Sequence, residues 1–165
     1  RENLTDAEIE ELIREMEKMF SEEGYEKTYQ WAVNTINEYP NCNLLIWQIA
    51  VMLDSRRILG ECENPDRYDD QINSWYELAL MMRTRASSTN AADSLFGFYL
   101  RKQNYEMAEK YLNYFSDYDP MKKVNWGRLY MEQGKTEEAY ESWRMLFFRI
   151  HHLKSGFFHY DSKGS

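Results

Sequence analysis

The sequence predicts an all-α fold built from consecutive helix pairs, and three observations carry that prediction. The 165 residues include only seven Gly and three Pro, which leaves little room for the turns of a β fold. Apolar residues recur at helical spacing in one segment after another, and short glycine or polar turns separate the segments. Hydrophobic residues make up 43% of the chain, a share that argues against disorder.

The length fits one domain, or one lobe of a larger protein. A domain of about this size buries roughly 70% of the surface of its unfolded chain, so it needs no disulfide or metal to hold it together. Because the chain begins at Arg1 rather than Met, we expect it to be a fragment.

The first helix pair is expected within residues 5–40. A capping box from Thr5 to Glu8 predicts the start of a helix, and Gly24 predicts its end. A second helix follows and stops at Tyr39, because a residue that precedes proline avoids the α region. The two apolar stripes comprise Ile9, Leu12, Ile13, Met16, Met19 and Phe20, then Tyr25, Tyr29, Ala32, Val33 and Ile36.

Two more pairs are expected before residue 120. A third helix spans about residues 43–59 and a fourth about 67–83, and the loop of residues 60–66 between them lengthens this pair by roughly ten residues. The polar cluster of residues 87–90 is expected to cap a fifth helix over about 91–102. A sixth helix is expected from Tyr105 to Asp117, ahead of Pro120.

The most informative stretch runs from residue 126 to 149 and predicts two helices joined by a tight turn. Two small residues stand where the helices would cross closely, two aromatic residues would fill the space beside the crossing, and one glycine can adopt the left-handed turn. These residues are Gly127, Tyr130, Gly134, Ala139 and Trp143.

This spacing resembles the tetratricopeptide repeat, a helix pair of about 34 residues. The resemblance covers residues 9–153 as four units, about 9–42, 43–86, 87–120 and 121–153, with a tail over 154–165. It implies a single domain over residues 1–165, a short right-handed array of about four helix pairs. The alternative is an irregular helical bundle that has this spacing by chance.

Charge and cysteine usage restrict the function further. The net charge of −8 makes the chain a poor binder of nucleic acid by itself. Residues 1–38 carry −7 and residues 121–165 carry +3, and the acidic start reads as a solvated helix face or as an acidic docking patch. Cys42 and Cys62 match no disulfide, metal or redox pattern, so we expect reduced cysteines in a cytoplasmic protein. No membrane span or signal peptide is expected.

No stretch indicates catalysis. His151 and His152 are neighbours on a predicted helix and point about 100° apart, so a metal would need further ligands. No phosphate loop and no spacing of a nucleophile and a base is present. We therefore expect no enzyme activity, no cofactor and no metal.

The resemblance also implies a concave binding face, because the first helix of each unit lines that face in such arrays. A peptide could be held there by amide contacts to its backbone and by guanidinium contacts to a carboxylate. A merely solvated groove is equally compatible, and Asp93 or Glu132 could already neutralise the arginines. The candidate residues are Trp47, Asp54, Asn90, Asp93, Arg101 and Arg128.

The degenerate repeats, the acidic character and segments such as NEYPNCNLLIWQIA resemble the C-terminal part of bacterial helix-turn-helix transcriptional regulators of the xenobiotic-response-element type. That resemblance implies an upstream DNA-binding domain, a homodimer, and a regulatory role for this part. The apolar tail with Phe157, Phe158 and Tyr160 is expected either to cap the last unit or to form a dimer contact. A free-standing scaffold for protein–protein interaction is the alternative, and an accessory domain of an enzyme comes third.

Overall fold

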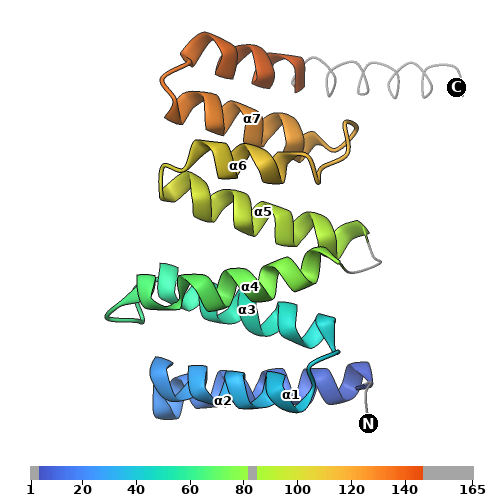
Figure 1. The fold of residues 1–165 in the computed structure, drawn as a ribbon, viewed down its shortest axis with the longest axis vertical. Helices are drawn as coiled ribbons and strands as arrows, with labels where there is room; N and C mark the ends of the chain where they lie inside the picture. The colour runs from blue at the N-terminus through green and yellow to red at the C-terminus, as the bar shows by residue number, and fades with distance from the viewer. Residues whose placement is uncertain (1–3, 82–84, 147–165) are drawn as a thin grey trace, which may run out of the picture. The chain divides into compact units, whose positions relative to one another are not determined.

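The computed structural model describes residues 4–81 and 85–146, and in these ranges it contains helices and turns but no strand. The prediction of an all-α fold is therefore confirmed (Figure 1). The chain divides into two compact units, residues 1–91 and 92–165. No helix in the described ranges combines the length and the apolar character that crossing a bilayer requires.

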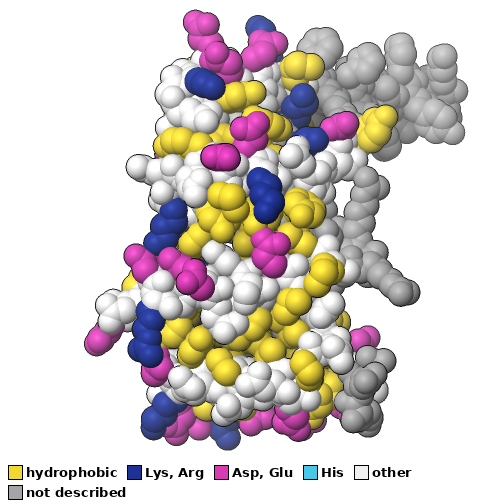
Figure 2. All heavy atoms as spheres, in the orientation of Figure 1, with side chains coloured by type: hydrophobic (Ala, Val, Ile, Leu, Met, Phe, Trp, Pro, Cys, Tyr) yellow, Lys and Arg dark blue, Asp and Glu magenta, His cyan; other side chains and the backbone are white. Residues whose placement is uncertain are grey.

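The first unit begins with α1 (Asp6–Glu23) and α2 (Tyr25–Glu38), which lie side by side in Figure 1. Thr5 and Glu8 form the predicted capping box, in which each side chain accepts a hydrogen bond from the other residue's backbone N–H. Gly24 has a φ of +85°, a conformation that favours glycine, and it separates the two helices as predicted. In Figure 2, acidic and basic side chains both lie along the edge of this helix pair.

The rest of the first unit contains α3 (Asn43–Ile58), a short 3₁₀ helix η1 (Pro65–Tyr68) and α4 (Asp69–Leu80). The helix α3 packs against α4, α2 and α1. The fourth helix was expected from residue 67, but its α-helical part starts two residues later because Pro65 begins a 3₁₀ turn instead. The core between these helices includes Leu45, Ile49, Leu53, Ile72 and Ala79, all 0% exposed.

The second unit takes in most of α5 (Arg85–Arg101), then α6 (Tyr105–Leu112), α7 (Pro120–Glu132) and helical residues 136–146. Two sequence predictions were wrong here. The polar cluster of residues 87–90 lies within α5 and does not precede it, and α6 ends at Leu112 rather than near Asp117. The turn predicted at Gly134 is present, with a φ of +76°.

Where α7 crosses residues 136–146, small residues lie at the contact, as the sequence predicts. Ala139 is fully buried, and a Cβ on Gly127 would lie only 1.9 Å from the indole nitrogen of Trp143. The same indole nitrogen donates a hydrogen bond of 3.3 Å to the carbonyl oxygen of Val124. The Trp143 ring therefore occupies the space that the missing side chain of Gly127 leaves open.

Candidate functional site

A chain of polar contacts joins α5 to α7 in the second unit. The side-chain amide of Asn125 donates a hydrogen bond of 2.9 Å to Oδ1 of Asp93. Its oxygen accepts one of 3.2 Å from Nη1 of Arg128. Asn125 is 0% exposed, so both of its polar groups find their partners inside the protein, as a buried amide requires. This buried amide therefore connects the carboxylate of Asp93 to the guanidinium of Arg128.

Arg128 is exposed at the surface, and its guanidinium packs against a side chain of α5. Its guanidinium carbon is 5.3 Å from the centre of the Phe96 ring, a distance at which a cation is attracted to an aromatic face. Because Phe96 is fully buried, the ring offers a rigid platform. Arg128 is thus held on one side while its outer side remains accessible to solvent.

The side chain of Arg101 reaches the turn of α5 that contains Phe96 and Gly97. Asp93, Gly97 and Arg101 are spaced by four residues, so they share one face of the helix. Nη1 of Arg101 lies 3.3 Å from the position that a Cβ on Gly97 would take. The absence of a side chain at Gly97 lets this guanidinium lie close to the backbone of α5.

The structure contradicts the alternative in which Asp93 or Glu132 neutralises the two arginines. Within residues 4–81 and 85–146, neither Arg101 nor Arg128 forms an ion pair with a carboxylate, Asp93 and Glu132 included. Asp93 instead accepts its hydrogen bond from Asn125. We call Asp93, Arg101, Asn125, Arg128 and the turn at Gly97 the α5–α7 face.

The candidate residues of the first unit have different surroundings. Trp47 lies in α3, partly buried, and its indole N–H has no acceptor among the described residues. Asn90 lies in α5 and is exposed. Asp54 is only 6% exposed and forms part of an internal network rather than an open groove.

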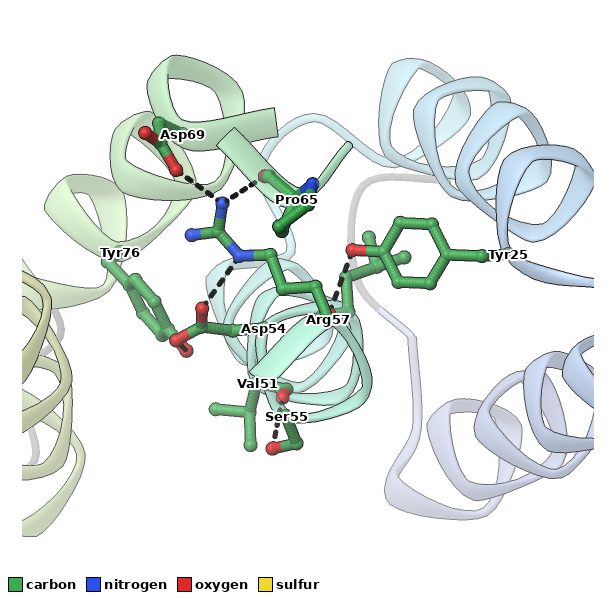
Figure 3. A network of polar contacts seen from close by, with 9 residues as sticks. Tyr25, Val51, Asp54, Ser55, Arg57, Pro65, Asp69 and Tyr76 are labelled. Atoms are coloured by element: carbon green, nitrogen blue, oxygen red, sulfur yellow. Dashed lines mark hydrogen bonds and ion pairs between the residues drawn. The ribbon is translucent and has the colours of Figure 1, made fainter. Parts of the chain in front are cut away.

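That network is centred on the guanidinium of Arg57, which is also buried (Figure 3). Nε of Arg57 donates to Asp54 at 2.9 Å, and Nη1 donates to Asp69 at 2.6 Å and to the Pro65 carbonyl at 2.9 Å. The second oxygen of Asp54 accepts a hydrogen bond of 2.8 Å from the Tyr76 hydroxyl. Burial acts to lower the pKa of Arg57, but its two carboxylate partners outweigh burial, and the net shift is upward.

These contacts give the network a structural role. They fasten η1 and α4 to α3 and so close the loop of residues 60–66, whose role the sequence left open. Beside this loop, a cavity of about 280 Å³ is lined by residues that include Glu26, Cys62 and Tyr68. The hydroxyl of Tyr68 donates to Glu26, and this hydrogen bond is the main cause that lowers the pKa of the Glu26 carboxyl.

Sequence reasoning missed Asn125, Phe96 and Gly97, although they hold the two arginines in place. A polar Asn in the middle of an otherwise half-apolar helix was a visible signal, because such an amide is either exposed or needs buried partners. Asp93 lies 32 residues away in the chain, so no local pattern could identify it as that partner.

The arrangement offers the donors that recognise an anion. No group of three or more His, Cys, Asp or Glu side chains in the described ranges is placed to hold a metal ion. The α5–α7 face offers guanidinium donors on a supported surface, which is the chemistry that binds carboxylates.

Comparisons with known proteins do not add to this picture, since no protein-family model, no curated protein and no solved structure matches the chain.

Proposed function

We propose that the chain is a non-catalytic binding and oligomerisation module whose α5–α7 face takes a peptide or protein segment bearing a carboxylate. The observation that carries the proposal is the placement of Arg128. The buried amide of Asn125 and the ring of Phe96 hold its guanidinium, and no carboxylate of the described residues neutralises it.

A carboxylate from another molecule is the natural partner for such a group. An arginine that is already oriented loses less side-chain entropy on binding than a freely rotating one, so more of the interaction energy is available for affinity. Arg101 approaches the same turn of α5 and can contribute a second guanidinium.

We also infer the finer architecture, a short right-handed array of about four tetratricopeptide-like helix pairs. Its support is the full burial of a small residue at the same place in the last two pairs: Ala108 and Ala139 are each the fourth residue of the second helix of their pair, and each is 0% exposed. In such an array the first helices of neighbouring units lie next to each other, as the hydrogen bond between α5 and α7 requires.

Within this class, we propose that the chain is the regulatory, homodimeric part of a cytoplasmic bacterial helix-turn-helix regulator. The support is the resemblance of the sequence, and the alternative is a free-standing scaffold for protein–protein interaction. The full open reading frame separates the two proposals. A basic helix-turn-helix of about 60 residues ahead of Arg1 would favour the regulator, and its absence would favour the scaffold.

The binding proposal is tested by calorimetry of the chain against paired peptides. Each pair has one sequence, once with a free C-terminal carboxylate or an acidic side chain, and once amidated or neutral. We expect binding of the anionic member only, with an affinity that weakens as salt rises. If no anionic peptide in a broad set binds better than its neutral partner, the proposal is wrong.

A further inference from the structure

The histidine pair and the aromatic tail of residues 147–165 lie outside the described part of the chain, whereas every residue around the cavity beside the loop of residues 60–66 is described. This cavity of about 280 Å³ lies within the first unit. Ligand sites measure roughly 300–1,000 Å³, so a cavity of this size fits a small ion or one long side chain. Its aromatic and charged lining residues are Tyr25, Glu26, Glu61, Glu63, Arg67 and Tyr68.

The charged side chains around the cavity leave one negative charge without a partner. Glu26, Glu61 and Glu63 supply carboxylates to the lining, and Arg67 supplies its guanidinium. Arg67 pairs with Glu26, and Arg56, which lies outside the lining, pairs with Glu61 at 3.1 Å. Glu63 forms no ion pair with any described residue. The cavity therefore favours a positively charged occupant.

Two buried tyrosines in the lining offer aromatic rings rather than hydrogen-bond donors. The ring centres of Tyr25 and Tyr68 are 5.1 Å apart. The hydroxyl of Tyr25 donates to the Leu53 carbonyl oxygen at 2.8 Å, and the hydroxyl of Tyr68 donates to Glu26. Arg57, whose charge acts on Tyr25, is already held by the two carboxylates of its own network. The tyrosines therefore suit a cation, which is attracted to an aromatic ring, better than an anion.

The guanidinium of Arg67 already makes the contacts that such a cation would make. Its carbon lies 5.7 Å from the centre of the Tyr68 ring, and its Nη1 lies 3.7 Å from Oε2 of Glu26. That nitrogen–oxygen distance is longer than a hydrogen bond, and the Arg67 side chain is 66% exposed. Exposed ion pairs contribute little free energy, so a ligand with the same group can displace Arg67.

We propose that the cavity binds an alkylguanidinium group, which replaces Arg67 on the Tyr68 ring and pairs with the carboxylate of Glu63. A guanidinium stacks on an aromatic ring and pairs with carboxylates through its planar fork, so one group matches both features of the cavity. The source of the group is a small guanidine or the arginine side chain of a peptide. The site is independent of the α5–α7 face, so either proposal can fail without the other.

A nuclear magnetic resonance titration of the full chain tests this site. The probes are butylguanidinium, an acetylated arginine amide and, as a neutral control of similar shape, butylurea. We expect both cations to shift the amide signals of residues 61–68 at millimolar concentration, and butylurea to shift them at least about fivefold less. The cation that binds more tightly identifies the source of the group. Unchanged signals with both cations, or equal shifts with butylurea, would overturn the proposal.

Two variants should change the affinity for butylguanidinium in opposite directions. Arg67→Ala removes the competing guanidinium, so binding should tighten at least about threefold. Glu63→Gln removes the unpaired carboxylate, so binding should weaken at least about threefold. The controls Arg14→Ala and Glu11→Gln change exposed charges of α1 outside the lining and should alter the dissociation constant less than about twofold. Weaker binding by Arg67→Ala, or equal effects of the two glutamate variants, would contradict the proposal.

The partly buried thiol of Cys62 also lines the cavity and reports its charge without a ligand. With Cys42→Ala in place, Cys62 is the only cysteine of the chain. The reference is Ser74→Cys, at an exposed position of α4, in a chain without the two native cysteines. We expect the rate ratio of a cationic to an anionic methanethiosulfonate to be at least about fivefold higher at Cys62 than at the reference. An equal ratio, or no reaction of Cys62 with either reagent, would overturn the proposal.

Discussion

Asn125 and Asp93 lie 32 residues apart in the chain, and a hydrogen bond of 2.9 Å joins them across two helices. Because Asn125 is fully buried and also accepts from Arg128, its side chain acts as a spacer that keeps the acid and the base of the α5–α7 face apart. Without this amide, Arg128 would be free to pair with Asp93.

Replacing the spacer should therefore affect both stability and binding. Asn125→Ala leaves a cavity and removes two hydrogen bonds, so we expect the free energy of unfolding to fall by about 1–3 kcal/mol. Chemical denaturation measures that loss. Asn113→Ala, at an exposed position in the same unit, should cost less than about 0.5 kcal/mol. Similar losses for the two variants would show that the Asn125 contacts do not stabilise the fold.

Two glycines within helices should respond in opposite ways to alanine. At Gly127 the new Cβ would meet the Trp143 ring at 1.9 Å, so we expect Gly127→Ala to destabilise by about 1–3 kcal/mol. At Gly97 the new Cβ meets only the mobile end of Arg101 at 3.3 Å, and alanine is the better helix former by about 1 kcal/mol. Gly97→Ala should therefore leave stability unchanged or raise it. Denaturation midpoints decide, and a loss at Gly97 as large as that at Gly127 would contradict this packing.

Among the polar clusters of the first unit, the Arg57 network should cause the largest loss of stability when it is disrupted. Arg57→Ala would leave the buried carboxylate of Asp54 without its cation, so we expect a loss of about 3–5 kcal/mol. Lys27→Ala breaks an ion pair with Glu23 whose two side chains are 71% and 44% exposed, and it should cost less than about 1 kcal/mol. Thermal denaturation of both variants tests the ranking, and a small effect at Arg57 would refute it.

The hydrogen bond between Tyr68 and Glu26 should make stability depend on pH in a specific way. The pKa of Glu26 is lowered in the folded protein, so its contribution is present above the carboxyl's unfolded pKa of about 4.3 and is lost as pH falls through the lower folded value. Tyr68→Phe should therefore destabilise by about 1 kcal/mol at pH 7. That difference should shrink below about pH 4.

Tyr29→Phe is the matched control for that titration, because Tyr29 packs against the Tyr68 ring at 4.6 Å. Its effect on stability should not vary with pH over the same range. Denaturation midpoints at a series of pH values give both curves, and a Tyr68→Phe effect that stays constant down to pH 3 would contradict the assignment.

Local signals in the sequence were reliable, and contacts between distant helices were not predictable from it. The capping box at Thr5 and the turns at Gly24 and Gly134 depend on neighbouring residues alone, and the structure confirms each of them. The start of α5 was wrong, because a polar cluster that can cap a helix can also lie within one.

The site was predicted less well than the fold for the same physical reason. Arg101 and Arg128 could be proposed from the repeat register, but the support of Arg128 by Phe96 and Asn125 depends on how α5 and α7 meet. Asp54 was proposed for the groove, yet its partner Tyr76 comes from a helix whose packing no local pattern specifies, and so does Asp69, which binds Arg57 of the same network.

The role of Arg128 tests the central claim most directly. Calorimetry should compare the chain, Arg128→Ala and Arg144→Ala for a peptide whose free carboxylate is required for binding, and the thermal midpoint of each protein should be recorded. Arg144 is a fair control because it is exposed in the same unit and is already paired with Glu141.

We expect Arg128→Ala to weaken peptide binding at least about tenfold while changing stability by less than about 1 kcal/mol, and Arg144→Ala to change neither substantially. Unchanged affinity for Arg128→Ala, or a fold that collapses with this single substitution, would contradict the assignment of the α5–α7 face as a carboxylate-binding site.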